Sequence, residues 1–215
     1  MSEIVQDYIE DYIRGLIPEG NPLLEAFRIR AVADEIPIIH PEVQNYIEIL
    51  IKSRNIKSIL EIGTAVGYSA SVFATAMGSM GQVDTIERSL KMVSEAGDNI
   101  GELGISSQIN LILGDALEKV ETITKTYDMI FLDGAKGHYI HLLDACLRCL
   151  KPGGVLVSDN VLFKGMIASD ALVIRRKITI VKRMRKYLEA ISDHPQLLTT
   201  VLPLGDGLAV SWMKN

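Results

Sequence analysis

The chain lacks the features that mark secreted, membrane-bound or disulfide-stabilised proteins. It has only two cysteines in 215 residues, and no apolar run approaches the ~18 residues that a membrane-spanning helix needs. Its first residues are acidic and do not show the basic-then-apolar order of a signal peptide. We therefore expect a soluble, cytoplasmic protein without a membrane partner.

The two cysteines, Cys146 and Cys149, form a C-x-x-C pair, for which a redox or zinc function is one interpretation. No second pair of cysteines or histidines lies at zinc-ligand spacing, and the pair falls near the end of an apolar helical stretch. Free cysteine is often a small core residue, so we favour a packing role for both.

Internal repeats, low-complexity tracts and linkers are also absent, which favours a single domain over residues 1–215. Short apolar segments alternate with helical stretches, a rhythm typical of a doubly wound, Rossmann-like α/β fold with a mostly parallel sheet. The five predicted parallel strands cover residues 58–62, 82–86, 109–113, 127–132 and 155–158.

Two further strands, at residues 198–203 and 208–212, bring the predicted sheet to seven strands. They follow a long helical stretch and are joined through Gly205-Asp206-Gly207, a turn sequence that suits an antiparallel hairpin at the sheet edge.

Residues 1–55 are expected to form a helical cover for the Rossmann-like core at residues 56–215. Pro41 suits a first helical turn. The apolar residues that follow it at helical spacing are Val43, Tyr46, Ile47, Leu50 and Ile51. These helices would cover the sheet or a neighbouring subunit.

Ligands of such a sheet bind beyond the carboxyl ends of its strands, so the residues that follow each strand are candidates for the site. The first strand leads into Glu61-Ile62-Gly63-Thr64-Ala65-Val66-Gly67-Tyr68-Ser69, in which Gly63 and Gly67 let the backbone turn sharply. Glu87 follows the second strand, 20 residues past Gly67, where a carboxylate can accept hydrogen bonds from ribose hydroxyls. After the third strand, Gly114-Asp115-Ala116 places another acid where an adenine amino group would lie.

Glycine after a strand is common, so an ordinary turn is the alternative interpretation of this loop. The chain has neither G-x-G-x-x-G nor G-x-x-x-x-G-K-[ST], which disfavours a dinucleotide-binding dehydrogenase and a P-loop NTPase. Acids after three strands suit a cofactor without phosphates. S-adenosylmethionine carries a sulfonium and an ammonium group, which favour acidic surroundings.

Side chains with oxygen ligands follow the next two strands. Asp133 ends the fourth strand, and Asp159 and Asn160 end the fifth, so neighbouring strands should bring the three together. Their oxygens suit Mg²⁺ or Ca²⁺ and not zinc. Lys136, three residues past Asp133, is placed to take a proton from a hydroxyl bound there. Helix capping and solvation are the alternatives for each residue taken singly.

Together these residues resemble the metal-dependent class I O-methyltransferases, which include catechol and caffeoyl-CoA O-methyltransferases. The similarity runs from about Ile36 to the C-terminus and includes Lys151-Pro152-Gly153-Gly154 and Tyr139. It implies Asp133 and Lys136 as catalytic residues, a metal held by Asp133, Asp159 and Asn160, and a homodimer. The positions that it implies for S-adenosylmethionine are Ile39, Glu61, Gly63, Gly67, Ser69, Glu87, Gly114, Asp115, Ala116 and Asp133.

Within that family the chain is most similar to the bacterial tRNA 5-hydroxyuridine methyltransferases, which make 5-methoxyuridine at the wobble position. The segments that carry this resemblance are residues 159–165, the basic stretch after them and residues 203–210. Two departures disfavour a catechol substrate: Gly137 stands where catechol-type enzymes have an acid, and Pro203 stands near their late glutamate. 5-Hydroxyuracil offers its 5-hydroxyl and 4-carbonyl as neighbouring oxygens, much as a catechol offers two hydroxyls.

Positive charge is concentrated in one segment. Seven cations and no acid lie between Arg175 and Lys186, and the formal charge of −5 becomes −12 when these seven are left out. If residues 174–191 form one helix, its apolar stripe comprises Ile174, Ile178, Val181, Met184, Leu188 and Ile191. The basic face opposite it, our candidate contact with tRNA, comprises Arg175, Arg176, Lys182, Arg183 and Lys186. A solvated face on a packed helix is the alternative.

The sequence therefore predicts an enzyme that uses S-adenosylmethionine and Mg²⁺ to methylate 5-hydroxyuridine at the tRNA wobble position. Methylation of a small catechol or a caffeoyl-CoA-like phenol is one alternative. A catalytically silent RNA- or nucleotide-binding protein is the alternative from another class.

Overall fold

Three helices precede a stretch in which strands and helices alternate, within residues 4–134 and 136–215, which the computed structural model describes. The N-terminal helices are α1 (Asp7–Gly15), α2 (Pro22–Ala33) and α3 (Pro41–Ser53). The later elements are β1 (Ser58–Ile62), α4 (Tyr68–Met77), β2 (Gln82–Glu87), α5 (Leu90–Glu102), β3 (Ile109–Leu113), α6 (Ala116–Thr122), β4 (Tyr127–Leu132), α7 (Tyr139–Cys149), β5 (Leu150–Ser158), α8 (Ile178–Asp193), β6 (Leu197–Leu202) and β7 (Leu208–Met213). Among these described elements, no helix has the length and apolar character that crossing a membrane requires.

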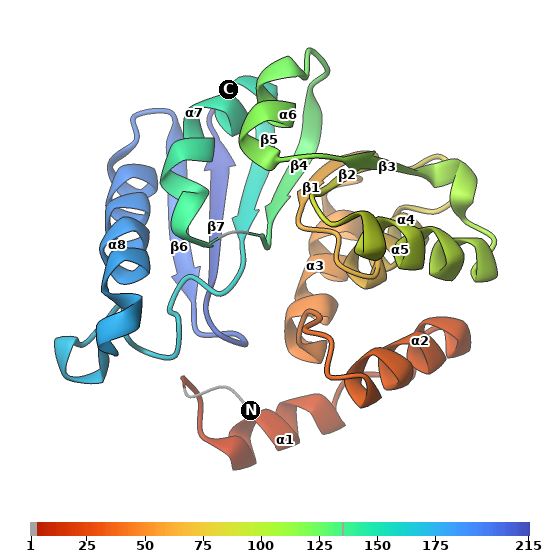
Figure 1. The fold of residues 1–215 in the computed structure, drawn as a ribbon, viewed down its shortest axis with the longest axis horizontal. Helices are drawn as coiled ribbons and strands as arrows, with labels where there is room; N and C mark the ends of the chain where they lie inside the picture. Colours follow the sequence, from red (N-terminus) through yellow and green to blue (C-terminus); the bar gives the residue numbers. More distant parts are fainter. Residues whose placement is uncertain (1–3, 135) are drawn as a thin grey trace.

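The described strands form one seven-stranded sheet in the order β3-β2-β1-β4-β5-β7-β6, which confirms the predicted fold class (Figure 1). Strands β1 to β5 run parallel, and β7 pairs antiparallel with both β5 and β6, so the C-terminal hairpin forms one edge. The direction of winding reverses between β1 and β4. Ligands of doubly wound sheets bind at that reversal, beyond the carboxyl ends of the strands.

The strand register sets which loops meet at this end of the sheet. Ile62 of β1 lies opposite Leu132 of β4, so the residues that follow, Gly63 and Asp133, are neighbours. Leu132 in turn lies opposite Ser158 of β5, which brings Asp133 beside the residue after Ser158. The glycine loop and the two candidate metal-binding acids therefore share one edge of the sheet.

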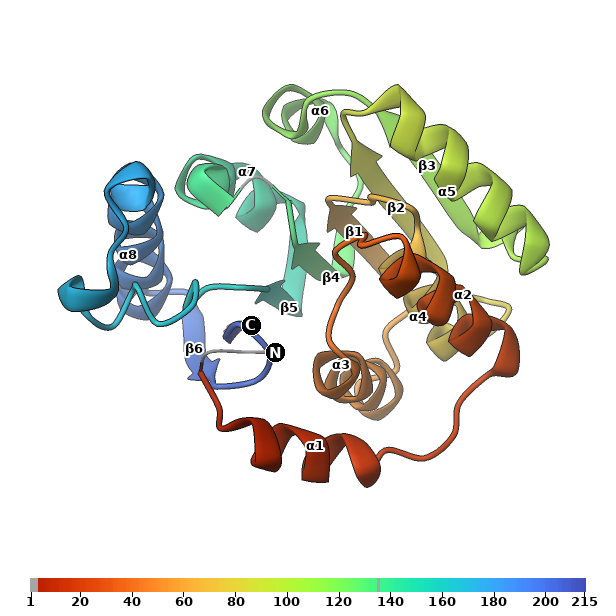
Figure 2. The same cartoon turned by 60° about the horizontal axis from the view of Figure 1, so that its bottom comes forward.

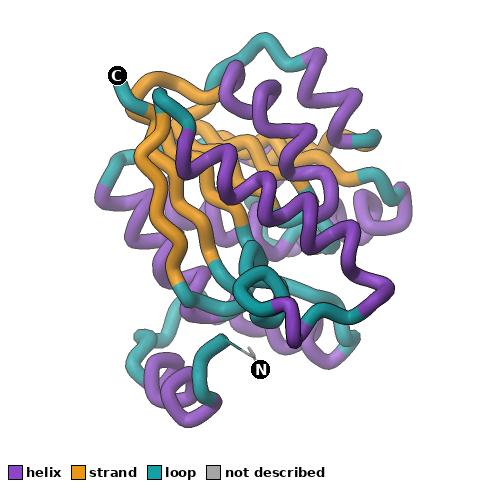
Figure 3. Tube along the Cα trace, turned by 90° about the vertical axis from the view of Figure 1, so that its left-hand side faces the viewer, coloured by secondary structure: helices purple, strands orange, loops and turns teal. Residues whose placement is uncertain are grey.

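Helices cover both faces of the sheet (Figure 3). Successive side chains of a strand point to opposite faces, so Ile59 joins a buried cluster with α3 residues such as Ile47, while Leu60 joins a cluster with α7. The second cluster includes Cys146 and Cys149, which are buried and unbridged. Burial raises the pKa of the Cys146 thiol, which fits the packing role expected of the pair.

The N-terminal helices bear out the pattern that follows Pro41. Pro41 is the first residue of α3, and Val43, Ile47 and Ile51 are buried on one side of the sheet. Helix α1 packs on the start of α3 and crosses below the ends of the parallel strands (Figure 1, Figure 2). It therefore lies near the edge at which a ligand is expected.

Strand β5 is longer than predicted. It begins at Leu150 and not at residue 155, because residues 151–154 continue the strand despite their proline and glycines. Tyr127 pairs with Leu150, and the register then shifts before Met129. This bulge accommodates the irregular residues in the strand.

The single helix predicted over residues 174–191 is wrong at its start. Arg175–Lys177 form a 3-10 turn, and α8 begins only at Ile178. Because a 3-10 turn has about three residues per turn, the apolar stripe does not continue through it in register. Ile174 and Ile178 are accordingly 49% and 39% exposed, whereas Val181, Met184 and Ile191 are buried and Leu188 is half-buried.

Candidate active site

Two adjoining cavities lie at the carboxyl ends of the parallel strands and share Gly63, Glu87 and Gly134 in their walls. The larger, of about 390 Å³, brings together residues predicted separately for the cofactor, the metal and the base. Those residues are Ile39, Gly63, Ser69, Glu87, Asp133, Lys136, Asp159 and Asn160. The smaller, of about 150 Å³, contains three more of the predicted residues, Gly114, Asp115 and Ala116.

Gly63 is required by the close approach of two loops. Its φ is 103°, and a Cβ there would lie 2.8 Å from the backbone nitrogen of Gly134 and 2.9 Å from the carbonyl of Asp133. The sharp turn predicted at this glycine is present, and the structure shows that the missing side chain also leaves room for the loop after β4. Gly67, with a φ of 86°, ends the turn directly before α4 and lines neither cavity.

Glu61 lies behind the cavity wall and does not line it. Its side chain is fully buried and accepts hydrogen bonds from Ser69 Oγ and Thr85 Oγ1, both at 2.5 Å. Burial raises the pKa of Glu61 to about 7, although the two hydroxyl hydrogen bonds oppose the rise. Glu61 therefore supports Ser69, in the first turn of α4, from behind the cavity wall, and its predicted contact with the cofactor stays a prediction.

Glu87 stands between the two cavities. Its Oε2 accepts a hydrogen bond from the backbone N–H of Ala65 at 3.1 Å, and its Oε1 accepts one from Ser89 at 2.9 Å. These bonds fix the carboxylate at the point predicted for a ribose. Each oxygen keeps a lone pair for a further donor.

The smaller cavity suits a flat ring. Its apolar walls come from Ile62, Ile86, Leu117 and Leu142. Asp115, at the rim, is exposed and also caps α6, since its Oδ1 accepts a hydrogen bond from Leu117 N at 2.9 Å. Asp115 therefore both caps α6 and lines the cavity.

Asp133, Asp159 and Asn160 meet in the wall of the larger cavity, as predicted. Asp159 is 1% exposed, and its Oδ1 accepts a hydrogen bond from Asn160 N at 2.7 Å. Burial raises the pKa of both aspartates, the negative charge of Asp133 raises that of Asp159 further, and Lys136 opposes both rises. Two repelling carboxylates and an amide at one cavity fit a hard divalent cation, which would offset their repulsion.

Asn160 contributes a neutral amide to this set, whereas Asp133 and Asp159 contribute carboxylates. Its backbone has a φ of 57°, a left-handed conformation that asparagine tolerates better than most residues. With an amide as the third member, the set is not a cluster of three acids, histidines or cysteines. No cluster of that kind suited to a metal occurs within residues 4–134 and 136–215.

Tyr139 ties the ends of β4 and β5 together. It is fully buried, and its Oη lies 3.0 Å from the carbonyl oxygen of Leu132 and 3.2 Å from that of Asp159. Leu132 directly precedes Asp133, so one hydroxyl reaches the backbone beside both acids. The structure thus gives a positioning role to a residue that the family resemblance had only matched.

Lys136 begins the 3-10 turn Lys136–His138 and lines the larger cavity, beside the candidate metal-binding residues. Its Nζ lies 5.7 Å from the centre of the Phe163 ring. Phe163 belongs to the loop after β5. The loop of the C-terminal hairpin contacts this loop through two hydrogen bonds: Leu162 N donates to Asp206 O at 3.0 Å, and Lys164 N donates to Asp206 Oδ1 at 2.5 Å. The hairpin therefore holds the aromatic ring against the predicted base.

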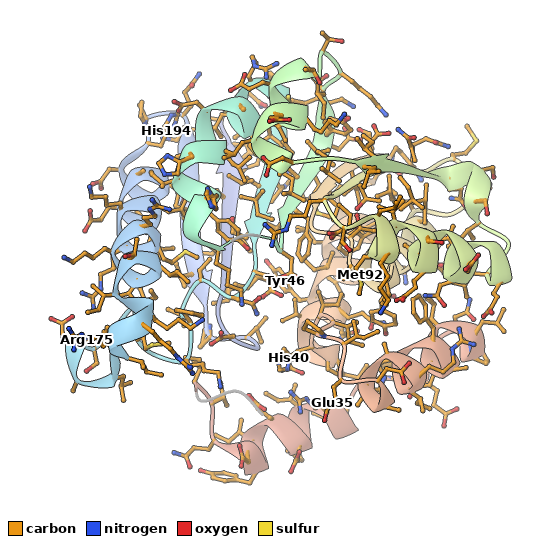
Figure 4. The ribbon with its side chains drawn as sticks, viewed as in Figure 1. Glu35, His40, Tyr46, Met92, Arg175 and His194 are labelled. Atoms are coloured by element: carbon orange, nitrogen blue, oxygen red, sulfur yellow. The ribbon has the colours of Figure 1, made fainter. Side chains whose placement is uncertain are left out.

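His40 lines the larger cavity from the side of α3 and is fixed by α1. Arg14 Nη2 lies 3.1 Å from His40 Nδ1, and the same guanidinium donates to Glu42 at 2.8 and 3.0 Å. Figure 4 shows His40 on the side of α3 that faces the strand ends. Helix α1 thus helps to position one wall of the cavity.

The basic residues predicted to contact tRNA differ in how freely they can bind a ligand. Within the described part of the chain, four of them are exposed and have no ion pair: Arg175, Arg176, Lys182 and Lys186. Arg183 is half-buried and donates a hydrogen bond to the carbonyl oxygen of Gly137 at 3.3 Å, next to Lys136. Its guanidinium faces the active-site turn, a contact that the helical spacing of the sequence did not predict.

A model of the O-methyltransferase family matches residues 21–214 of this chain. The chain belongs to that family. A catechol O-methyltransferase of Niastella koreensis is 31% identical over 176 residues, which cover 79% of this chain and 80% of the relative. A catechol O-methyltransferase of Mycobacterium tuberculosis is 26% identical, with 96% of this chain and 95% of the relative covered.

Two solved structures support the same family assignment. A Staphylococcus aureus protein, provisionally named a caffeoyl-CoA O-methyltransferase, has a TM-score of 0.90 and 35% identity, with 96% of this chain and 100% of that chain covered. A Bacillus cereus O-methyltransferase, solved in complex with SAH, has a TM-score of 0.84 and 25% identity, with 96% and 97% covered. The chain is an S-adenosylmethionine-dependent O-methyltransferase, so the silent-protein alternative is set aside.

Sequence reasoning missed several residues of this O-methyltransferase site. Thr85 left a faint signal, as a polar residue within an apolar strand. Phe163 and Asp206 lie in segments that carry the family resemblance, but their roles could not be predicted because they depend on the contact between the hairpin loop and the loop after β5. His40 precedes the proline of α3 and was not considered, since nothing in its neighbourhood resembles a motif.

Proposed function

We propose that this enzyme methylates the 5-hydroxyl of 5-hydroxyuridine at the wobble position of tRNA, with the help of a divalent cation such as Mg²⁺. The observation that carries the proposal is the convergence of Asp133, Asp159, Asn160 and Lys136 on one cavity beside the cofactor loop. Such a site suits an acceptor with two neighbouring oxygens, which 5-hydroxyuracil provides. A tRNA substrate would also imply a cytoplasmic location.

The chemistry that these side chains can perform is an in-line displacement. A divalent cation, when bound, would make the acceptor hydroxyl more acidic and fix its direction. Asp133, Asp159 and Asn160 are the residues that would hold it. Lys136 takes the hydroxyl proton while the oxygen forms a bond to the methyl carbon and the carbon–sulfur bond breaks. The sulfonium leaves as a neutral thioether, and the proton stays on Lys136, so charge balances.

Exposed positive charge on the segment that contacts the active-site turn supports an RNA substrate. Arg175 and Arg176 lie in the 3-10 turn before α8, and Lys182 lies in α8 next to Arg183, which reaches the turn that carries Lys136. Phosphates would bind such cations without sequence specificity, and the cavity would select the base. Arg183 is better placed to hold the active-site turn than to bind phosphate.

Methylation of a small phenol is the second candidate, and the relatives' names favour it. Two similar proteins are named catechol O-methyltransferases. The metal set and Lys136 would serve a catechol equally well. A phenol, however, gives no use for the unpaired cations at the start of α8.

We also expect two copies of the chain to associate through their N-terminal helices. Tyr8 and Tyr12 on α1 and Leu16, the C-cap of that helix, lie four residues apart and are 71%, 70% and 65% exposed. This spacing places them on one face of the helix. Sedimentation analysis of the native protein and a Tyr12→Ser variant tests the expectation: a native monomer would contradict it.

The substrate is tested by nucleoside analysis of tRNA from cells that lack this protein. Loss of 5-methoxyuridine with accumulation of 5-hydroxyuridine would support the proposal. Unchanged 5-methoxyuridine in those cells, together with turnover of catechols by the purified protein, would favour the phenol instead.

A further inference from the structure

Two ammonium groups approach the ring of Phe163. Lys136 Nζ and Lys177 Nζ each lie 5.7 Å from the ring centre, so the two charges are no farther apart than twice that distance. A cation at this range is attracted to the ring face. One of the two charges is the predicted base, and the other comes from the turn before α8.

The backbone around Phe163 is held in an uncommon conformation. Phe163 and Lys164 have φ values of 45° and 58°, which are unfavourable for side chains of this size. The hydrogen bonds of Leu162 N and Lys164 N to Asp206 keep the loop in place. Strain of this kind persists where surrounding structure enforces it, often at ligand sites.

Lys177 differs from its basic neighbours in what it faces. It is half-buried, and no carboxylate forms an ion pair with it among the residues that the structure describes. Arg185, by contrast, pairs with Asp170 at 2.7 Å. Arg175, in the 3-10 turn before α8, lies away from His40 in the cavity wall (Figure 4). Lys177 is therefore an uncompensated cation turned toward the active site.

We propose that Lys177 binds the 5′-phosphate of the nucleotide whose base is methylated. The inference rests on the proposed RNA substrate. In the usual anti conformation of a pyrimidine nucleotide, the 5-substituent and the 5′-phosphate lie on the same side of the base. When the 5-hydroxyl lies at Lys136, the 5′-phosphate lies on the side of the Lys177 ammonium group, which also contacts Phe163. An ammonium–phosphate contact is a charge-assisted hydrogen bond, which a free phenol cannot make.

The test is a double-mutant cycle on tRNA assembled by ligation with 5-hydroxyuridine at the wobble position. One tRNA has natural phosphates, a second has a neutral methylphosphonate 5′ to the target uridine, and a third has it 3′ to the target. Methyl transfer is measured as kcat/KM for the native enzyme and for Lys177→Ala, with Lys177→Arg as the conservative variant. Lys52→Ala, which removes an exposed charge paired with Glu48 at 3.4 Å, is the matched control.

We expect Lys177→Ala and the 5′ methylphosphonate each to lower kcat/KM about tenfold, the low end for a hydrogen bond to a charged group. Combined, they should cost no more than either alone, because both remove the same contact. The 3′ methylphosphonate should add to the effect of Lys177→Ala, Lys177→Arg should restore most of the rate, and Lys52→Ala should behave as native.

Independent, additive losses from Lys177→Ala and the 5′ methylphosphonate would overturn the assignment of Lys177. It would also be overturned if neither change alters the rate. A native enzyme that does not methylate the natural tRNA at all would instead refute the proposed function, before any variant is compared.

Discussion

Removing the hydroxyl of Tyr139 should lower both the free energy of unfolding and the affinity of the candidate site for a metal ion. The two effects can be measured separately. In Tyr139→Phe the carbonyl of Asp159 loses a donor at 3.2 Å, whereas the carbonyl of Leu132 keeps the N–H of Asp159 at 2.9 Å. The loss is thus close to one neutral hydrogen bond to a buried carbonyl. That corresponds to a decrease of about 1–2 kcal/mol in the free energy of unfolding, measured by urea denaturation.

The same hydroxyl also fixes the spacing of the two acids that would hold the cation. We expect the Mg²⁺ concentration for half-maximal methyl transfer to rise about tenfold in Tyr139→Phe, the low end of the effect of losing a hydrogen-bonded support of a metal ligand. The matched control is Tyr127→Phe. Tyr127 is also buried, and its Oη donates to Asp84 at 2.7 Å at the opposite end of β4.

Tyr127→Phe should lose comparable stability without any change in the Mg²⁺ requirement. If both variants lose stability and neither changes its Mg²⁺ requirement, Tyr139 is only a core residue and the reasoning about the strand ends is refuted. A changed requirement in both variants would mean that general loosening of the fold, and not the strand ends, controls metal affinity.

Three further predictions concern other parts of the site. Lys136→Met should lower kcat about 10²- to 10⁴-fold in methyl transfer assays, as expected for loss of a general base, and a loss below tenfold would argue against that role. Glu61 has a pKa of about 7 in the fold against 4.5 unfolded, so its ionisation lowers the free energy of unfolding as pH rises from 4.5 to 7. In denaturation of the cofactor-free protein, the free energy of unfolding of Glu61→Gln should fall less steeply with pH, by up to about 1.4 kcal/mol per pH unit. Parallel curves of unfolding free energy against pH for the native protein and the variant would contradict the raised pKa of Glu61. Arg175→Ala/Lys182→Ala should reduce the salt dependence of tRNA binding by about one unit of slope per lost phosphate contact, whereas an unchanged slope would exclude both residues from the interface.

The sheet could be predicted from the sequence because its strands are short apolar runs with clear boundaries. The start of β5 was missed because Pro152, Gly153 and Gly154 resemble a loop, and only the pairing of Leu150 with Tyr127 shows that the strand includes them. The start of α8 was missed for a related reason. Ile174 and Ile178 continue the helical spacing, but the 3-10 turn between them breaks the register.

The candidate site could be predicted as a set, because residues that directly follow parallel strands share one edge. The contacts of each side chain could not be predicted in the same way. Glu61 belongs to the glycine-loop motif, yet the strand turns its side chain into the interior. Arg183 shares a helical face with Lys182, but only the packing of α8 on the turn after β4 shows that it binds the Gly137 carbonyl. Phe163 and Lys177 lie in the same connection between β5 and α8, and only the path of that connection brings them together.

The central claim is that a divalent cation at Asp133, Asp159 and Asn160 enables methyl transfer to 5-hydroxyuridine in tRNA. It is tested most directly by following transfer of a labelled methyl group from S-adenosylmethionine to such a tRNA before chelation, after chelation and after Mg²⁺ is restored. We predict methylation that disappears on chelation and returns with Mg²⁺, and that Asp159→Ala abolishes under all three conditions. Methylation that persists without divalent cations, or no methylation of this tRNA at all, would contradict the account.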